Sequence, residues 1–160
     1  MPPPEPDPLA RALGRIPSGL YIVTTLVDGQ PQGFLASFVM QASLAPPIVS
    51  VSVGRDRPIL AELRRSGRFA VSILDADSKK SMAAFTRRLG AGESPFDRLQ
   101  VATTPAGLPV LAEALAWFEC RLASEHATGD SVIVFGEVVA GSLTREGEPH
   151  VHVRRNGLSY

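Results

Sequence analysis

Apolar and polar residues alternate most regularly in the segment IVSVSV, which covers residues 48–53. Val49, Val51 and Val53 fall on one side of an extended backbone, and Ser50 and Ser52 fall on the other. Because strand side chains point to opposite faces in turn, this pattern predicts a strand with one buried face and one face that carries hydroxyl groups.

The residues around this strand are those of turns and helix starts. A pair of prolines stands before it, where neither can donate a ladder hydrogen bond or continue a helix. Gly54 ends the strand, and two arginines, Arg55 and Arg57, follow in the turn. Pro58 then opens a predicted helix over 59–65, since proline suits the first helical position.

The rest of the chain is mostly short strands separated by turn residues. Asp28-Gly29 is a hairpin signal, and Gly136 inside an apolar strand predicts a bulge or a close backbone approach. The predicted strands cover residues 20–26, 68–74, 114–124, 131–139 and 150–153, and residues 99–109 are expected to be irregular. This pattern predicts a mainly β fold, a closed or nearly closed antiparallel barrel with a few peripheral helices.

Two further helices are predicted, a short one over 9–13 and a longer one over 78–89 that is capped by Asp75 or Asp77. The apolar stripe of the longer helix consists of Met82, Phe85 and Leu89. Its other face carries Lys79, Lys80, Arg87 and Arg88, and a solvated surface is the favoured interpretation of that basic face. The barrel leaves apolar strand faces uncovered, so a homodimer is expected to cover them.

Composition excludes several classes of protein. The chain has 160 residues and a formal net charge of zero, which fits one domain and disfavours a nucleic-acid partner. Its one cysteine, Cys120, excludes an intrachain disulfide and suits a cytoplasmic location. No segment is apolar over the length of a membrane span. Residues 1–8 are predicted to be a disordered proline-rich arm rather than a secretory signal, and residues 9–160 the domain.

Candidate chemistry concentrates around the strand described first. Serine hydroxyls and two arginines meet at the start of a helix, which is a combination that suits an anion such as phosphate. A strand pair with a solvated basic turn explains the same residues, and both interpretations remain open. His150 and His152 share a strand face without an obvious third ligand, so no metal site is predicted. The sequence has no nucleophile elbow, no GxGxxG motif and no P-loop.

An ordered set of segments resembles one family. The segments are ALGRIPSGLYIVTT, GFLASFVMQASLAPPIVSVSV, ALAWFECRLAS, GDSVIVFGEV and HVRRNGLSY. Together they resemble the flavin reductase-like, FMN-binding split-barrel family, with the closest similarity to the flavin reductase domain at the C-terminus of some flavodiiron proteins. The resemblance implies a Greek-key split β-barrel that works as a homodimer, with FMN near the subunit interface.

The resemblance also implies where the cofactor lies. The residues that match the segment along the isoalloxazine are Ser37, Phe38 and Val39. Ser43 matches a phosphate or ribityl contact. The second flavin-binding segment corresponds to Ser52, Val53, Arg55 and Arg57. Weaker candidates for contact with phosphate or the nicotinamide nucleotide are Lys79, Arg87 and Arg88.

One position departs from the family pattern. Many relatives carry a histidine directly after the Gly-Asp pair, where this chain has Ser131. His152 matches a histidine near the C-terminus of the fused domains and is a candidate to replace part of its role. Ser131 and His152 are therefore the only catalytic candidates, and both assignments are weak because the cofactor supplies the chemistry.

The function implied is an NAD(P)H-dependent flavin reductase, which transfers hydride from the nicotinamide to flavin N5. Electrons would then pass to free flavin, a partner oxygenase or another acceptor. A non-catalytic FMN-binding electron carrier is the alternative, and the serine after Gly-Asp favours it modestly. A cofactor-free barrel that serves as an interaction module is a third hypothesis. NADH and NADPH, and FMN and FAD, stay undistinguished at this point.

Overall fold

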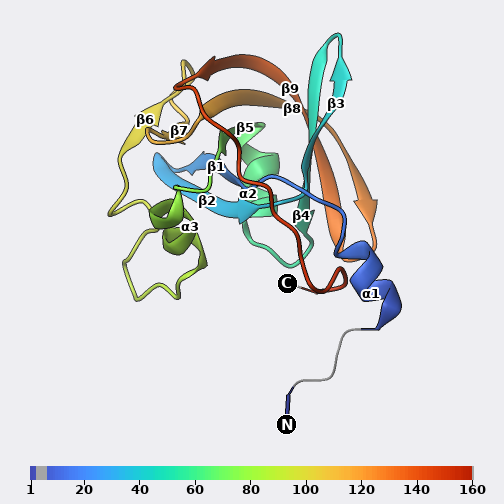
Figure 1. Cartoon of the computed structure of the whole chain (residues 1–160). Helices are drawn as coiled ribbons and strands as arrows, with labels where there is room; N and C mark the ends of the chain where they lie inside the picture. Colours follow the sequence, from blue (N-terminus) through green and yellow to red (C-terminus); the bar gives the residue numbers. More distant parts are fainter. Residues whose placement is uncertain (3–6, 160) are drawn as a thin grey trace.

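A seven-stranded antiparallel sheet forms the body of the computed structural model, which describes residues 1–2 and 7–159. The strand order across the sheet is β2-β1-β5-β8-β9-β4-β3, and a two-stranded ribbon, β6-β7, lies beside it (Figure 1). The strands are β1 (Tyr21–Val27), β2 (Gln30–Ala36), β3 (Val39–Leu44), β4 (Pro47–Gly54), β5 (Arg68–Ile73), β6 (Val101–Thr103), β7 (Pro109–Leu111), β8 (Ala116–Thr128) and β9 (Ser131–Leu143).

The sheet curls around one core without closing. Phe34 of β2 and Val51 of β4, which belong to strands near its opposite ends, lie in the same buried cluster. The edge strands β2 and β3 are the two ends of the hydrogen-bonded order, so the barrel is split between them. The prediction of a mainly β split barrel is confirmed, and of the two forms expected from the strand pattern, closed or nearly closed, the barrel takes the one that is not closed.

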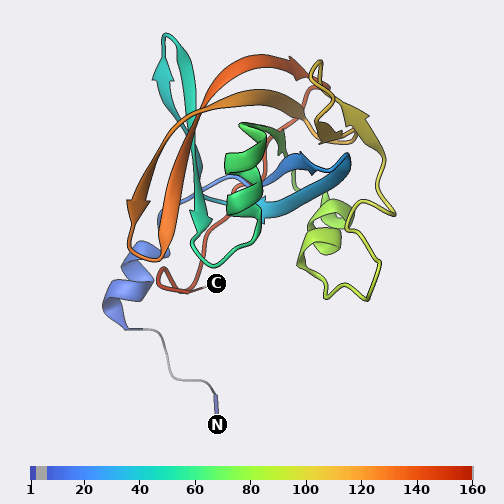
Figure 2. The ribbon, with the colours of Figure 1, turned by 180° about the vertical axis from the view of Figure 1, so that it is seen from behind.

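Helix α2 (Ile59–Ser66) lies inside the curve of the sheet, as the front and back views agree (Figures 1 and 2). Leu60 and Leu63 are 4% and 0% exposed and belong to the same core as the strands. The helix ends at Gly67, whose φ of 66° is a left-handed conformation that glycine adopts without strain. The other face of the helix, with Ala61 and Arg64, is exposed, so α2 covers the core with one face, in line with the expected peripheral helices.

Alternation and turn chemistry gave correct local predictions. The three valines of β4 are buried, as the period of two requires. Asp28 and Gly29 have φ values of 50° and 76°, which is the backbone that a two-residue hairpin turn needs between β1 and β2. At Gly136, a Cβ atom would lie 2.5 Å from Cζ of Phe69. The predicted close approach of the backbone is confirmed.

Other boundaries differ from the predictions. The long hairpin β8-β9 extends beyond the predicted strands 114–124 and 131–139, and the region 99–109, expected to be irregular, contains β6 and the first residue of β7. The predicted strand 150–153 is wrong, because its only pairing is an isolated bridge between His152 and Ser18.

Helix α3 (Lys79–Thr86) is three residues shorter at its C-terminal end than predicted, because Arg87 is already extended with ψ of 153°. Met82 and Phe85 pack against a second buried cluster, as expected from the stripe. Leu89 lies beyond the helix and is 39% exposed, so its assignment to the buried stripe is wrong.

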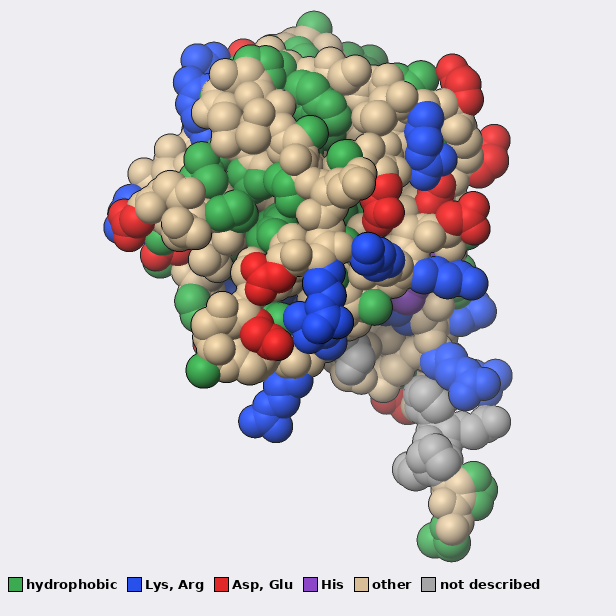
Figure 3. Space-filling view, turned by 90° about the vertical axis from the view of Figure 1, so that its left-hand side faces the viewer, with side chains coloured by type: hydrophobic (Ala, Val, Ile, Leu, Met, Phe, Trp, Pro, Cys, Tyr) green, Lys and Arg blue, Asp and Glu red, His purple; other side chains and the backbone are tan. Residues whose placement is uncertain are grey.

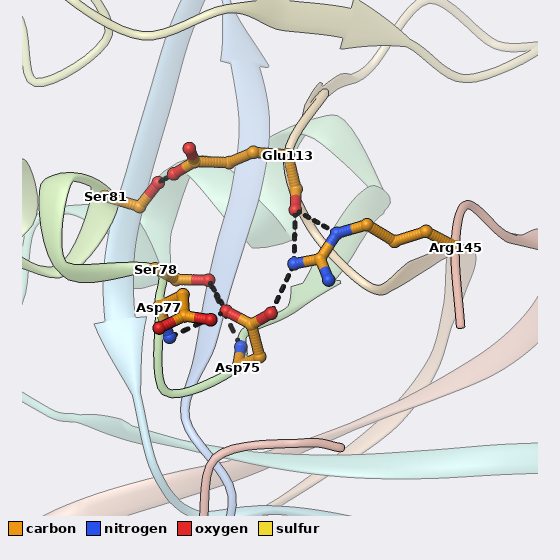
Figure 4. Close-up of polar contacts among 6 residues, drawn as sticks. All are labelled: Asp75, Asp77, Ser78, Ser81, Glu113 and Arg145. Atoms are coloured by element: carbon orange, nitrogen blue, oxygen red, sulfur yellow. Dashed lines mark hydrogen bonds and ion pairs between the residues drawn. The ribbon is translucent and has the colours of Figure 1, made fainter. Parts of the chain in front are cut away.

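The start of α3 is held by a cluster of polar contacts (Figure 4). Asp75 or Asp77 was expected to cap this helix, but Ser78 is the N-cap residue and makes no side-chain cap hydrogen bond. Asp75 Oδ1 instead accepts hydrogen bonds from the Ser78 hydroxyl at 2.8 Å and from the Asp77 N–H at 3.0 Å. Its other oxygen pairs with Arg145, and the bond from Arg145 is the main reason why the pKa of Asp75 is lowered.

A second contact in the same region links the helix to the loop before β8. The hydroxyl of Ser81, which is fully buried, bonds to the carboxylate of Glu113, and Arg145 donates to the Glu113 carbonyl at 3.1 Å. The first turn of α3 is thus tied to the segment after β9. Its last turn, with Phe85 and Thr86, then points to the cleft described below.

Helix α1 (Pro8–Leu13) begins one residue earlier than predicted, and Asp7 caps it by accepting from the Ala10 N–H at 2.8 Å. Residues 3–6 of the predicted disordered arm fall outside the described residues. The segment before the C-terminus runs back beside this helix (Figures 1 and 2). In the described part of the chain, no helix has the length and apolar character needed to cross a membrane.

Candidate functional site

A cleft of about 940 Å³ opens near the gap between the edge strands. Its walls come from the end of β2, the turn after β4, the last turn of α3, the β8-β9 turn and the C-terminal segment. Segments that are far apart in the sequence therefore meet at one place. A volume of this size lies within the range of natural ligand pockets.

Six of the residues predicted for the site line this cleft. They are Ser37, Phe38, Ser52, Arg57, Ser131 and His152. The strand β4 brings Ser52 to the cleft because its alternation buries the valines and turns the serines outward. The sheet pairing of β4 with β9 brings the β8-β9 turn to the same end.

The other residues of the two predicted flavin segments lie elsewhere. Val53 is 1% exposed in the core, so only its backbone could meet a ligand. Val39 lines a neighbouring hollow, and Ser43 lies further along the β3-β4 hairpin. Arg55 donates its backbone N–H to the Asp130 carbonyl at 2.9 Å, but its side chain is not part of the cleft wall. Their assignments remain predictions.

The three weaker candidates are also outside the cleft wall. Lys79 is exposed in the first turn of α3, and Arg88 is exposed after the helix. Arg87 lies 3.5 Å from Glu93 in an ion pair. The same helix contributes Phe85 and Thr86 to the cleft instead.

Two arginines in the cleft each cover a phenylalanine ring. The guanidinium of Arg57 lies 5.3 Å from the centroid of Phe34, and that of Arg154 lies 4.8 Å from the centroid of Phe38. Stacking on an aromatic face holds a guanidinium in place while its N–H groups stay directed to the sides. Arg154 was missed at the level of the sequence, although it belongs to the closing segment that carried part of the resemblance.

Comparison with known sequences identifies the family. Residues 13–157 match the family described as the flavin reductase like domain. The chain belongs to the flavin reductase-like family. The resemblance inferred from the sequence is confirmed.

Relatives of this flavin reductase-like domain come from several bacteria. Diflavin flavoprotein A 1 of Synechocystis sp. is 36% identical over 154 residues, which is 95% of this chain but 27% of that protein. The chain therefore spans about a quarter of the length of that relative. The reductase subunit HsaB of a flavin-dependent monooxygenase from Rhodococcus jostii is 32% identical over 94% of this chain and 75% of its own length.

A solved structure supports the same fold. The NADH:FAD oxidoreductase SgcE6 of Streptomyces globisporus superposes with a TM-score of 0.83 and 30% sequence identity. The superposition covers 91% of this chain and 86% of that chain. The flavin reductase-like domain thus has the split-barrel fold that its sequence predicted.

The two catalytic candidates differ in their surroundings within this flavin reductase-like domain. The Ser131 hydroxyl donates to the Asp130 carboxylate at 2.9 Å, so its proton is already in a hydrogen bond within the turn. His152 stacks on His150 with ring centroids 6.3 Å apart. The pKa of His152 is lowered, first by burial and then by the charges of His150 and Arg154, which favours a neutral imidazole at neutral pH.

The residues of the cleft fit a flavin nucleotide. Phe38 and Phe85 offer apolar surface for a planar ring, Ser37 and Ser52 offer hydroxyls, and Arg57 offers a cation for a phosphate. A second, mostly apolar hollow of about 730 Å³ adjoins the cleft and shares Phe38 with it.

One face of the molecule carries mixed charge. On the face shown in Figure 3, acidic and basic side chains surround a group of hydrophobic ones, and Lys and Arg side chains gather around the histidine that is visible there. This distribution agrees with a formal net charge of zero, in which local basic groups are balanced elsewhere.

Proposed function

We propose that this chain is an NAD(P)H-dependent flavin reductase that binds FMN in the cleft. The observation that carries the proposal is the cleft itself, in which Arg57 over Phe34 lies beside hydroxyls and apolar rings. The names of two relatives support it, because one is a reductase subunit and another an NADH:FAD oxidoreductase. FMN and FAD both suit such a cleft, and FMN is our choice from the resemblance to flavodiiron-fused domains.

In this proposal, the chain's own residues bind and orient. Arg57 holds the phosphate, Ser52 and Ser37 bond to polar atoms, and the phenylalanines exclude water from one ring face. The chemistry supplied by a bound flavin is acceptance of a hydride from a nicotinamide nucleotide and its release to a further acceptor. Neutral His152 offers one N–H donor and one acceptor for orienting a ligand, rather than a positive charge.

We further propose that the chain works as a homodimer. Met40 of β3 and Val151 of the C-terminal segment are 68% and 67% exposed, and both line the apolar hollow beside the cleft. Exposed apolar side chains gathered in this way are typical of a protein interface. The reductase subunit among the relatives supports a separate oxygenase as one possible electron acceptor.

A second candidate function is that of an FMN-binding electron carrier. It is favoured by the serine that follows Gly-Asp, where many family members have histidine, because its hydroxyl is already bonded to Asp130. Anaerobic addition of NADH or NADPH separates the two functions. Bleaching of the flavin spectrum within seconds supports the reductase, and bleaching by dithionite alone supports the carrier.

Replacing Arg57 tests the location of the site. Arg57→Ala should weaken FMN binding by about 1.5–3 kcal/mol, which is the range of a charge-assisted hydrogen bond and about a 10- to 150-fold rise in Kd. The Kd can be measured by quenching of flavin fluorescence. Arg98→Ala is the matched control, because Arg98 is exposed and lies outside the cleft wall. Equal FMN affinity in the two variants would disprove the proposed phosphate position.

A further inference from the structure

The C-terminal segment forms one wall of the cleft through His152, Arg154 and residues 157–159. We propose that Arg154 is a specificity-determining residue, which binds a phosphate group of a nucleotide in this cleft. The proposal rests on the proposed function, because it needs a nucleotide to bind there. It adds a second cation, from a different part of the chain, to the one that Arg57 provides.

The backbone of Arg154 is fixed on both sides by the N-terminal region. Its N–H donates to the Gly14 carbonyl at 3.2 Å, and its carbonyl accepts from Nη2 of Arg15 at 2.6 Å. Three residues later, the Gly157 N–H donates to the Ala10 carbonyl at 2.7 Å. These contacts between residues 10–15 and 154–157 are called the terminal clasp below.

Two glycines make the terminal clasp possible. A Cβ atom at Gly157 would lie 2.6 Å from the backbone nitrogen of Gly14, and a Cβ atom at Gly14 would collide with the backbone of Arg154. Backbone atoms cannot move aside as the end of a flexible side chain can. The two segments therefore approach as closely as they do only without side chains at these positions, and this approach holds Arg154 beside the cleft.

The side chain of Arg154 is directed by Phe38. Its guanidinium lies 4.8 Å from the ring centroid, and this half-buried side chain lines the cleft. Phe38 lies between β2 and β3, and its carbonyl accepts from the Ser52 N–H at 3.0 Å. The ring that supports Arg154 is therefore itself anchored to the strand that carries Ser52.

The charged side chains of the cleft wall favour an anion. Among the described residues of the wall, Arg57 and Arg154 are the cations and Asp130 is the carboxylate, and the Ser131 hydroxyl already bonds to that carboxylate. The pKa of His152 is lowered by burial first and then by the charges of His150 and Arg154, which favours a neutral imidazole. A phosphate placed beside Arg154 would thus meet a planar donor whose orientation is set by Phe38.

The sources of such a phosphate are the flavin nucleotide and the nicotinamide nucleotide, and one set of variants distinguishes them. The variants are Arg154→Gln and, as a matched control, Arg155→Gln, since Arg155 is the exposed neighbour outside the cleft wall. For each, the Kd for FMN and for riboflavin is measured by fluorescence quenching, and the KM for NADH and for NADPH is measured with FMN saturating. Riboflavin has the same ring as FMN without the phosphate.

In Arg154→Gln, we expect the Kd or KM of one phosphate-bearing ligand to rise by about tenfold or more. This is the loss expected for one charge-assisted hydrogen bond. A rise in the Kd of FMN without a rise for riboflavin assigns Arg154 to the flavin phosphate. A rise in KM of a nicotinamide nucleotide without a change in FMN binding assigns it to the electron donor. In either case Arg155→Gln should resemble the unaltered protein.

Three results would overturn the inference. In the first, Arg154→Gln has the same Kd and KM values as Arg155→Gln for every ligand. In the second, Arg154→Gln weakens the binding of FMN and of riboflavin equally and leaves both KM values unchanged, which would mean that Arg154 acts only by supporting Phe38. If the unaltered protein binds neither flavin, the proposed function fails and this inference fails with it. Arg154→Lys keeps the charge without the planar fork, so partial recovery of affinity, with an unchanged thermal midpoint, excludes misfolding as the cause.

Discussion

The contact between Asp75 and Arg145 makes a stability prediction that depends on pH. Asp75→Asn preserves the size of the side chain and an oxygen that can still accept from Asp77 and Ser78. It removes the negative charge that Arg145 meets. A charge-assisted hydrogen bond contributes about 1.5–3 kcal/mol, and the 43% exposure of the Arg145 side chain places this one at about 1–2 kcal/mol.

The sign of the pH dependence follows from the direction of the shift. The pKa of Asp75 lies below its ordinary value of 3.8, chiefly because of Arg145 and then Ser78. The stabilisation is therefore complete above pH 3.8, where the unfolded chain is also ionised, and is lost as the pH falls through the lower pKa of the folded state. We expect the thermal midpoint of Asp75→Asn to be about 2–8 °C lower at pH 7, with the difference shrinking below pH 4.

Denaturant unfolding at pH 7, 5 and 3 measures this effect. Asp77→Asn is the control, since it retains the backbone N–H that donates to the Asp75 carboxylate and changes only an exposed carboxylate. A stability difference for Asp75→Asn that stays constant down to pH 3 would refute the argument, because it would come from something other than the ionised carboxylate. A variant as stable as the unaltered protein at pH 7 would refute it equally.

Two further predictions concern the core. Gly136→Ala should destabilise the fold by about 1–3 kcal/mol because its methyl group would lie 2.5 Å from buried Phe69, while Gly90→Ala, with 3.5 Å to its nearest neighbour, should be close to neutral in the same denaturant titration. Equal denaturation midpoints for the two variants would contradict the predicted steric clash at Gly136. Burial raises the pKa of the Cys120 thiol to about 12, with a smaller effect from Glu119, so a thiol reagent at pH 8 should label the protein only after unfolding.

Local patterns were sufficient to predict much of the fold. Three predictions that depend on a few neighbouring residues were correct. They are the alternation in β4, the Asp-Gly turn and the close backbone approach at the glycine of β9. The position of α2 was not predictable in this way. Its amphipathic pattern indicates that one face is buried, but not that the sheet curls around it.

The candidate site was predicted in part for the same reason. Ser52 and Arg57 flank one turn, so their proximity can be inferred from the sequence. Arg154 was missed because its place depends on the terminal clasp, which joins residues about 140 positions apart. Its neighbour Arg155 has the same chemistry and lies outside the cleft wall, so residue type alone could not have separated them.

The position of the single tryptophan gives the molecule a natural optical probe. Trp117 of β8 packs against a third buried cluster, of Ala70, Leu108 and Val110, and is not part of the cleft wall. Its emission therefore reports on the integrity of that cluster without direct contact from a ligand. Because oxidised flavins absorb where indole emits, a flavin in the cleft would accept energy from one donor at one fixed location. Occupancy and unfolding could then be followed separately in a single sample.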